Sequence, residues 1–173
     1  MKKNIKIFLP LIVLFILMYT GYCMIKLSRQ QKNKTERITH IPPFELKNIQ
    51  GELFTNAELK EGVPVMFFYF NSECDFCQAE IKDIVTNIKK FEGIQLVFVS
   101  FEPIQKIITF QATHKLDIYD NVVFLSDYRN TFSETFDVKT LPSSLVYNEN
   151  GILVSRNNGA VKVNYLLKAL KNN

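Results

Sequence analysis

Apolar residues fall along the chain in blocks whose lengths and spacings fit the strands and helices of an α/β domain. The run 63–70 is almost entirely apolar, which is typical of a central strand buried on both faces of a sheet. After it, apolar residues recur at helical spacing over 81–91, and Gly93 ends that helix. The same pattern predicts further strands at 44–46, 52–54, 94–100, 122–125, 143–147 and 152–156, and helices at 103–115 and 163–171.

The order of these elements predicts an α/β fold with a central mixed β-sheet flanked by helices. Strand and helix alternate between residues 63 and 125, which favours a parallel core. Glycine turns at Gly51 and Gly151 join neighbouring strands into hairpins, and the first of these forms an N-terminal β-hairpin extension. We expect Asn56 to cap a short helical turn at 57–60 directly after that hairpin.

The N-terminal part of the chain is different in composition. Residues 7–25 form an uncharged, mostly apolar stretch of 19 residues behind the basic residues 1–6, which is long enough to cross a bilayer as a helix at about 1.5 Å per residue. Tyr22 stands where a signal-peptide cleavage site needs a small residue. We therefore predict an uncleaved transmembrane helix at 7–25, with Cys23 a bystander in it. A cleaved signal peptide and lipidation of Cys23 are the alternatives.

Charge separates the anchor from the rest of the chain. Residues 1–37 carry eight Lys and Arg against one acid, whereas residues 38–173 carry thirteen against sixteen, so the net charge of +4 comes from the N-terminal part. Its cations suit anionic lipid headgroups, and the slightly acidic remainder lacks the basic surface of a nucleic-acid-binding protein. The polar stretch 26–41 predicts a tether that leads into one domain at 42–173.

The candidate chemistry lies at Cys74 and Cys77, directly after the buried strand at 63–70. Two cysteines at this spacing, at the step from a strand into a helix, can close a small disulfide and reopen it. The unpaired N–H groups and the positive dipole end of the helix favour the thiolate of Cys74, and the thiolate is the species that attacks a disulfide. We therefore predict a redox pair.

Other uses of this pair fit the sequence less well. A structural zinc site needs four ligands, and the remaining Cys23, His40 and His114 lack ligand spacing. Haem attachment needs a histidine directly after the second cysteine, where Gln78 stands. An inert structural disulfide stays open as an alternative, although so short a loop removes little unfolded-state entropy. We expect no metal and no cofactor, and a surface or packing role for His114.

Three segments form a recognisable combination: Pro43-Phe44-Glu45-Leu46-Lys47-Asn48 with the strand Leu53-Phe54-Thr55, then Cys74-Asp75-Phe76-Cys77-Gln78-Ala79-Glu80, and finally Leu141-Pro142-Ser143-Ser144-Leu145. From about Pro42 to the C-terminus the chain thereby resembles a thioredoxin-like fold, specifically the membrane-anchored thiol-disulfide oxidoreductases of the TlpA/ResA type.

The resemblance implies roles for individual residues. Cys74 would be the exposed attacking cysteine, Cys77 the buried resolving cysteine, and Pro142 a cis-proline that faces the disulfide. Glu80 would move protons near the thiols, because a partly buried carboxylate has a raised pKa and can accept or donate a proton. An ordinary solvated helix residue is the alternative for Glu80. Glu102 resembles a further acidic position near such a site.

The chain departs from that family at several positions. Glu73 stands where an aromatic residue, often Trp, usually precedes the first cysteine, and Phe76 replaces the usual Pro or His. A thiol peroxidase would carry Thr at the position of Asn71. A thioredoxin-fold copper carrier would need a wider cysteine spacing and a well-placed histidine.

These observations predict a membrane-tethered thiol-disulfide oxidoreductase. By the resemblance it would reduce disulfides in envelope proteins such as cytochrome c precursors, draw electrons from a membrane donor, and serve cell redox homeostasis and cytochrome c biogenesis. We expect a monomer that contacts the bilayer through residues 7–25 and binds no nucleic acid. The alternative is a non-enzymatic thioredoxin-like binding or scaffold module at the membrane.

The membrane orientation is predicted by two conflicting arguments. Five basic residues follow the apolar span and three precede it, so the positive-inside rule favours a cytoplasmic domain. A tethered redox pair is most useful where disulfides persist. We expect the cell-membrane protein to hold its domain on the extracytoplasmic, periplasmic side.

Overall fold

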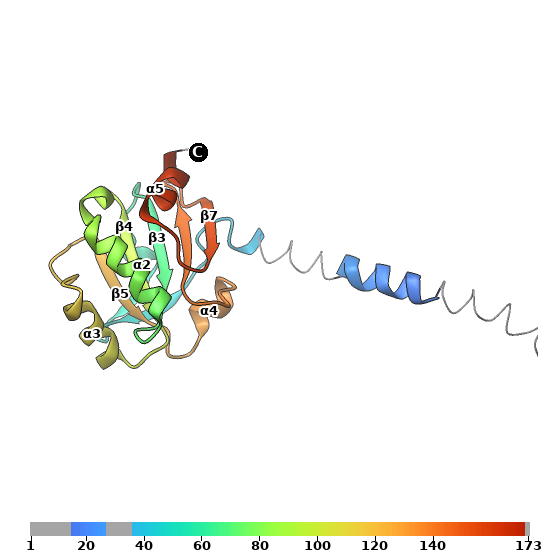
Figure 1. Ribbon diagram of the computed structural model, residues 1–173, viewed down its shortest axis with the longest axis horizontal. Coiled ribbons are helices and arrows are strands. Elements are labelled where there is room, and N and C mark those ends of the chain that lie inside the picture. The colour runs from blue at the N-terminus through green and yellow to red at the C-terminus, as the bar shows by residue number, and fades with distance from the viewer. Residues whose placement is uncertain (1–14, 27–35, 172–173) are drawn as a thin grey trace, which may run out of the picture. The chain divides into compact units, whose positions relative to one another are not determined.

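In a computed structural model the protein is described over residues 15–26 and 36–171 (Figure 1). The chain divides into two units, Met1–Arg37 and Ile38–Asn173. Residues 15–26 of the first unit are helical, and none of the described helices combines the length and apolar character needed to cross a membrane. The predicted span at 7–25 begins outside the described residues.

The second unit is built on a seven-stranded mixed sheet with the order β2-β1-β5-β4-β3-β6-β7. Strands β3, β4 and β5 are parallel, whereas β1 pairs antiparallel with β2 and β5, and β6 pairs antiparallel with β3 and β7. This arrangement confirms the predicted central mixed sheet and its N-terminal hairpin. The strands are β1 (Glu45–Asn48), β2 (Leu53–Thr55), β3 (Val65–Tyr69), β4 (Gln95–Ser100), β5 (Val122–Ser126), β6 (Ser143–Tyr147) and β7 (Leu153–Asn158).

The helices differ from the sequence prediction in two places. The helix predicted to run to Gly93 breaks at Asn87, whose side-chain Nδ2 donates to the backbone oxygen of Asp83 at 2.9 Å. A short helix at 131–135 was not predicted, because five residues are too few to show a helical period. The helical segments are η1 (Asn56–Glu58), α2 (Asp75–Thr86), η2 (Ile88–Phe91), α3 (Ile104–Thr113), α4 (Thr131–Thr135) and α5 (Val163–Lys171).

The capping prediction for the first turn was wrong by one residue. Thr55, not Asn56, is the N-cap of η1: its hydroxyl accepts the N–H of Ala57 at 3.2 Å, and Glu58 completes a capping box. The side-chain oxygen of Asn56 instead accepts the N–H of Phe44 at 2.9 Å. Asn56 therefore fixes the start of the hairpin rather than the turn.

Two apolar layers cover the two faces of the sheet. Phe68, Phe98 and other buried residues pack beneath α2, α3 and α5, which lie together over the sheet in Figure 1. Phe67 packs on the opposite face with Phe132 of α4 and with Phe136, which directly follows α4. Because successive strand residues point to opposite faces, a strand covered on both sides must be apolar throughout, as β3 is.

Residues 38–41, which the sequence prediction places in the tether, contact the domain. Ile38 is fully buried, and its carbonyl accepts the hydroxyl of Tyr147 at 3.1 Å. His40 forms an isolated β-bridge with Ile152. Residues 27–35 of the predicted tether lie outside the described part of the chain.

Candidate active site at the start of helix α2

The parallel strands bring three loops to one edge of the sheet. β3 pairs in register with β4, and β4 with β5, so the residues that follow each strand meet where the strands end. The loop after β3 carries Cys74, the loop after β4 carries Glu102, and the loop after β5 carries Asp127. This edge is therefore where groups distant in sequence can act together.

Cys74 is the N-cap residue of α2. Its backbone is extended, with φ −84° and ψ 117°, and its N–H donates to the carbonyl of Asn71 at 3.2 Å. Its own carbonyl accepts the N–H of Gln78 at 3.0 Å and so starts the helix. Within the described residues the Cys74 side chain makes no capping hydrogen bond, and it is half-buried. The sulfur is therefore placed at the positive end of the helix dipole and remains reachable from solvent.

Cys77 lies one turn further along α2 and is fully buried. Both cysteines are free thiols, three residues apart at the start of α2. Burial raises the pKa of the Cys77 thiol to about 12; the Cys74 side chain and the charge of Glu80 add to the rise, and the backbone of Asn71 opposes it. The pair is thus asymmetric, with one reachable sulfur and one buried, protonated sulfur.

Glu80 is buried beside this pair, with only 4% of its surface exposed. It follows Cys77 by three residues on the same face of α2, and its Oε1 accepts the N–H of Val161 at 3.0 Å. Burial raises the pKa of the Glu80 carboxyl to about 7, opposed by the Val161 hydrogen bond and reinforced by Asp83. The alternative of a solvated helix residue is therefore wrong.

Pro142 lies at the start of β6. The Leu141–Pro142 peptide bond is cis, which confirms the geometry that the family resemblance implied. Pro142 is buried, and its carbonyl accepts the N–H of Gly159 at 2.8 Å. Leu141 packs against the apolar layer that contains Cys77. The role of Pro142 toward a disulfide stays a prediction.

Glu102 holds the loop that precedes Cys74. Its carboxylate is buried and accepts both the N–H and the hydroxyl of Ser72, each at 2.7 Å, together with the hydroxyl of Ser100 at 3.2 Å. Sequence reasoning singled out Glu102 but missed Ser72 and Lys106. The Lys106 Nζ lies 2.6 Å from an oxygen of Glu73 and 3.8 Å from an oxygen of Glu102.

The other residues considered in the sequence analysis lie outside this arrangement. His114 is half-buried at the end of α3 and packs with its ring centroid 4.5 Å from that of Phe110, and burial lowers the pKa of its imidazole. Cys23 is exposed within the helical residues 15–26. In the described residues, His, Cys, Asp and Glu side chains form no group of three or more that could hold a metal ion.

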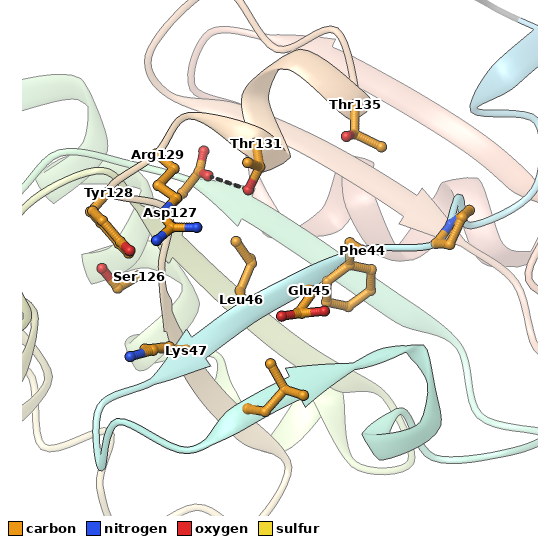
Figure 2. Close-up of a pocket in the computed structure, with 12 residues that line it drawn as sticks. Phe44, Glu45, Leu46, Lys47, Ser126, Asp127, Tyr128, Arg129, Thr131 and Thr135 are labelled. Atoms are coloured by element: carbon orange, nitrogen blue, oxygen red, sulfur yellow. Dashed lines mark hydrogen bonds between the residues drawn. The ribbon is translucent and has the colours of Figure 1, made fainter.

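Two clefts open near this edge of the sheet. One, of about 510 Å³, lies between β1 and the loop after β5, and neither Cys74 nor Cys77 lines it (Figure 2). Its buried Asp127 accepts the N–H of Phe132 at 2.9 Å and the hydroxyl of Thr131 at 3.3 Å, so this carboxylate serves to cap α4.

The second cleft, of about 440 Å³, lies beside the cysteine loop. It is lined by Ser72 and Gln78 on one side and by Lys106, Thr109 and other residues of α3 on the other. Neither Cys74 nor Cys77 lines it, so this cleft adjoins the loop that precedes Cys74 and not the two sulfurs themselves.

Known proteins resemble this chain in family and fold. The AhpC/TSA family matches residues 39–156. A secreted Mycobacterium tuberculosis disulfide oxidoreductase homologous to E. coli DsbE superposes with a TM-score of 0.64 at 19% identity, over 80% of this chain and 98% of that one. StoA from Bacillus subtilis superposes with a TM-score of 0.58 at 20% identity, over 76% of this chain and 98% of that one. Peroxidoxin BcpB from M. tuberculosis superposes with a TM-score of 0.66 at 19% identity, over 77% of this chain and 94% of that one. No curated protein sequence matches significantly. These likenesses confirm the thioredoxin-like fold.

Proposed function

We propose that this chain, which belongs to the AhpC/TSA family, is a thiol-disulfide oxidoreductase that works through Cys74 and Cys77. The observation that carries the proposal is the asymmetry of the two thiols at the start of α2. Cys74 is half-buried and lies at the helix N-terminus, whereas Cys77 is fully buried. A disulfide exchange needs these two properties, a sulfur that can attack the substrate and a second sulfur that can then attack the first.

The reaction then proceeds in two exchanges. The Cys74 thiolate attacks one sulfur of a substrate disulfide, so a mixed disulfide forms and the other substrate sulfur leaves as a thiolate. Cys77 loses its proton and attacks the sulfur of Cys74, which releases the second substrate sulfur. The substrate disulfide gains two electrons, and the Cys74–Cys77 disulfide holds the oxidised equivalent until a dithiol donor reduces it.

Glu80 is the group that we propose for the proton of Cys77. The Cys77 thiol has a pKa of about 12, so near neutral pH it needs a base before it can attack. The carboxyl of Glu80, with a pKa of about 7, is partly ionised at that pH and can accept the proton. It lies three residues along the same helix face.

We propose that the pair acts as a reductant. Negative charge near Cys74 disfavours its thiolate and thereby stabilises the disulfide relative to the dithiol. Exposed Asp75 and buried Glu80 supply such charge. Glu73 contributes less than its position in the sequence suggests, because its carboxylate is paired with Lys106.

The cellular setting is also a proposal and rests on the sequence. The apolar span at 7–25 and its basic flanks support a membrane-tethered protein of the TlpA/ResA type. The domain then faces the extracytoplasmic side, takes electrons from a membrane donor and reduces envelope proteins such as cytochrome c precursors. A membrane-impermeant maleimide applied to intact cells tests this, since it labels Cys74 only if the domain lies outside.

The Cys77→Ala variant tests the proposed activity. Without Cys77 the mixed disulfide cannot be resolved, so the variant should accumulate covalent complexes with substrate proteins that dithiothreitol releases. Cys74→Ala is the matched control and should trap nothing. If neither variant forms complexes, the non-enzymatic binding module becomes the better interpretation.

A peroxidase assay separates the remaining alternative. The similarity to a peroxidoxin makes hydrogen peroxide a substrate to test. Asn71 stands where a thiol peroxidase would carry Thr, and its side chain accepts the N–H of Glu73 at 2.9 Å. We therefore expect slow peroxide consumption compared with disulfide exchange; the reverse order would replace the proposed activity.

A further inference from the structure

A lysine on α3 reaches across to the loop that carries Cys74. Lys106 lies 2.6 Å from Glu73, directly before Cys74 in the chain, and 3.8 Å from Glu102. Their side chains are 50%, 74% and 4% exposed, respectively. The lysine therefore bridges an exposed carboxylate and a buried one, which hold two parts of the same loop.

Glu102 and Lys106 both contact the loop that precedes Cys74. Glu102 binds the backbone N–H and the hydroxyl of Ser72 at 2.7 Å each, so it fixes the middle of the loop. Lys106, four residues after Glu102 in the chain, contacts Glu73, the residue that follows Ser72. Together the two side chains clamp the backbone that ends in Cys74.

Lys106 also changes the electrostatic environment of Cys74, because it pairs with two carboxylates near the start of α2. Glu73 and Glu102 each place a negative charge near the start of α2, where the thiolate of Cys74 would form. Among the described residues, the ion pairs of both carboxylates come from Lys106. Its hydrogen bond lowers the pKa of Glu73, and Glu73 in turn raises the pKa of the Lys106 ammonium. The charge of Lys106 is thus held in place at the pH where exchange takes place.

We infer that Lys106 is a positioning residue for Cys74, which holds the cysteine loop against α3 and offsets the two carboxylates that oppose the Cys74 thiolate. The inference rests on the proposed function for its biological meaning. The reactivity of the Cys74 sulfur, which it concerns, can be measured without any substrate protein. Nothing in the sequence alone links Lys106 to Glu73, 33 residues away.

Alkylation of the reduced full chain by iodoacetamide at neutral pH and low ionic strength, with peptide mapping of the labelled site, tests this inference. Lys106→Met keeps most of the side-chain stem and removes the charge, so Cys74 should react about two- to fivefold more slowly, the range expected for an exposed ion pair. Lys106→Arg should restore the rate. Lys168→Met, an exposed lysine of α5, is the matched control for net charge and should react like the parent.

Two further variants separate charge from bracing. Glu73→Gln removes one opposing charge while Lys106 remains, so Cys74 should react faster than in the parent. The double variant Glu73→Gln with Lys106→Met should return toward the parent rate. High salt should reduce the difference between Lys106→Met and the parent, because it screens exposed charges.

The inference is overturned if Lys106→Met alkylates at the parent rate at low salt, or if Lys168→Met slows the reaction as much. If Lys106→Met loses thermal stability while its alkylation rate stays unchanged, Lys106 stabilises the fold only and does not affect the reactivity of Cys74. Because alkylation needs no substrate protein, these results do not depend on the proposed activity, which the Cys77→Ala trap tests with Lys106 intact.

Discussion

The buried carboxyl of Glu80 should make the stability of this protein fall as the pH rises, and Glu80→Gln should remove that dependence. Burial raises the pKa of Glu80 from 4.5 to about 7, so between these values the folded chain binds a proton that the unfolded chain has already lost. The stability contributed by the protonated carboxyl is therefore fully present below pH 4.5 and is lost as the pH rises through 7.

The size of the effect follows from the pKa values. Compared with acid pH, the raised pKa of Glu80 lowers the stability of the folded protein by about 1 kcal/mol at pH 5 and by roughly 3 kcal/mol at pH 8, at 1.36 kcal/mol for each pKa unit. Glutamine keeps the shape of the side chain and an oxygen for the N–H of Val161, but it cannot ionise. The stability of Glu80→Gln relative to the parent should therefore rise by about 2 kcal/mol between pH 5 and pH 8.

Urea unfolding of the reduced full chain in mild detergent, followed by far-UV circular dichroism because the chain has no tryptophan, measures this difference. Glu45→Gln, which changes an exposed carboxyl on β1, is the matched control and should not reproduce the pH dependence. An offset between Glu80→Gln and the parent that stays constant from pH 5 to pH 8 would refute the reasoning. So would a variant that loses relative stability as the pH rises.

Three other predictions concern the cysteine pair and the domain. Iodoacetamide should label Cys74 before Cys77 at neutral pH, because Cys77 is buried and its pKa is about 12; peptide mapping decides, and preferential labelling of Cys77 would reverse the roles. Equilibration with glutathione should place the pair near roughly −250 mV, and a pair that stays reduced in a mildly oxidising buffer would be an oxidant. A chain that begins at Ile38 should fold and remain monomeric by size-exclusion chromatography, because Ile38 is already part of the core; a molten or insoluble product would contradict this boundary.

Local pattern was sufficient for much of the fold. The apolar run at 63–70 predicted β3, and the strand at 143–147 and the helix at 163–171 agree with β6 and α5. These elements are long enough to show their period, and each is bounded by turn residues or glycine. The helix α4 has five residues and showed no period, so its place depends on the burial of Phe132 and Phe136 against the sheet.

The features of the candidate site also separate into those that are local in the sequence and those that depend on contacts between distant residues. The positions of Cys74 and Cys77, after a buried strand and at the start of a helix, could be predicted from the sequence, because their spacing and the preceding apolar run are local features. The burial of Glu80 depends on residue 161, and the pairing of Glu73 depends on Lys106.

Such contacts join segments 81 and 33 residues apart, and no local period records them. The packing of distant segments therefore determines that Glu80 is removed from solvent and that Glu73 is paired with a cation. These two environments set the pKa values of Glu80 and Glu73, since desolvation disfavours the charged form and a neighbouring cation favours it.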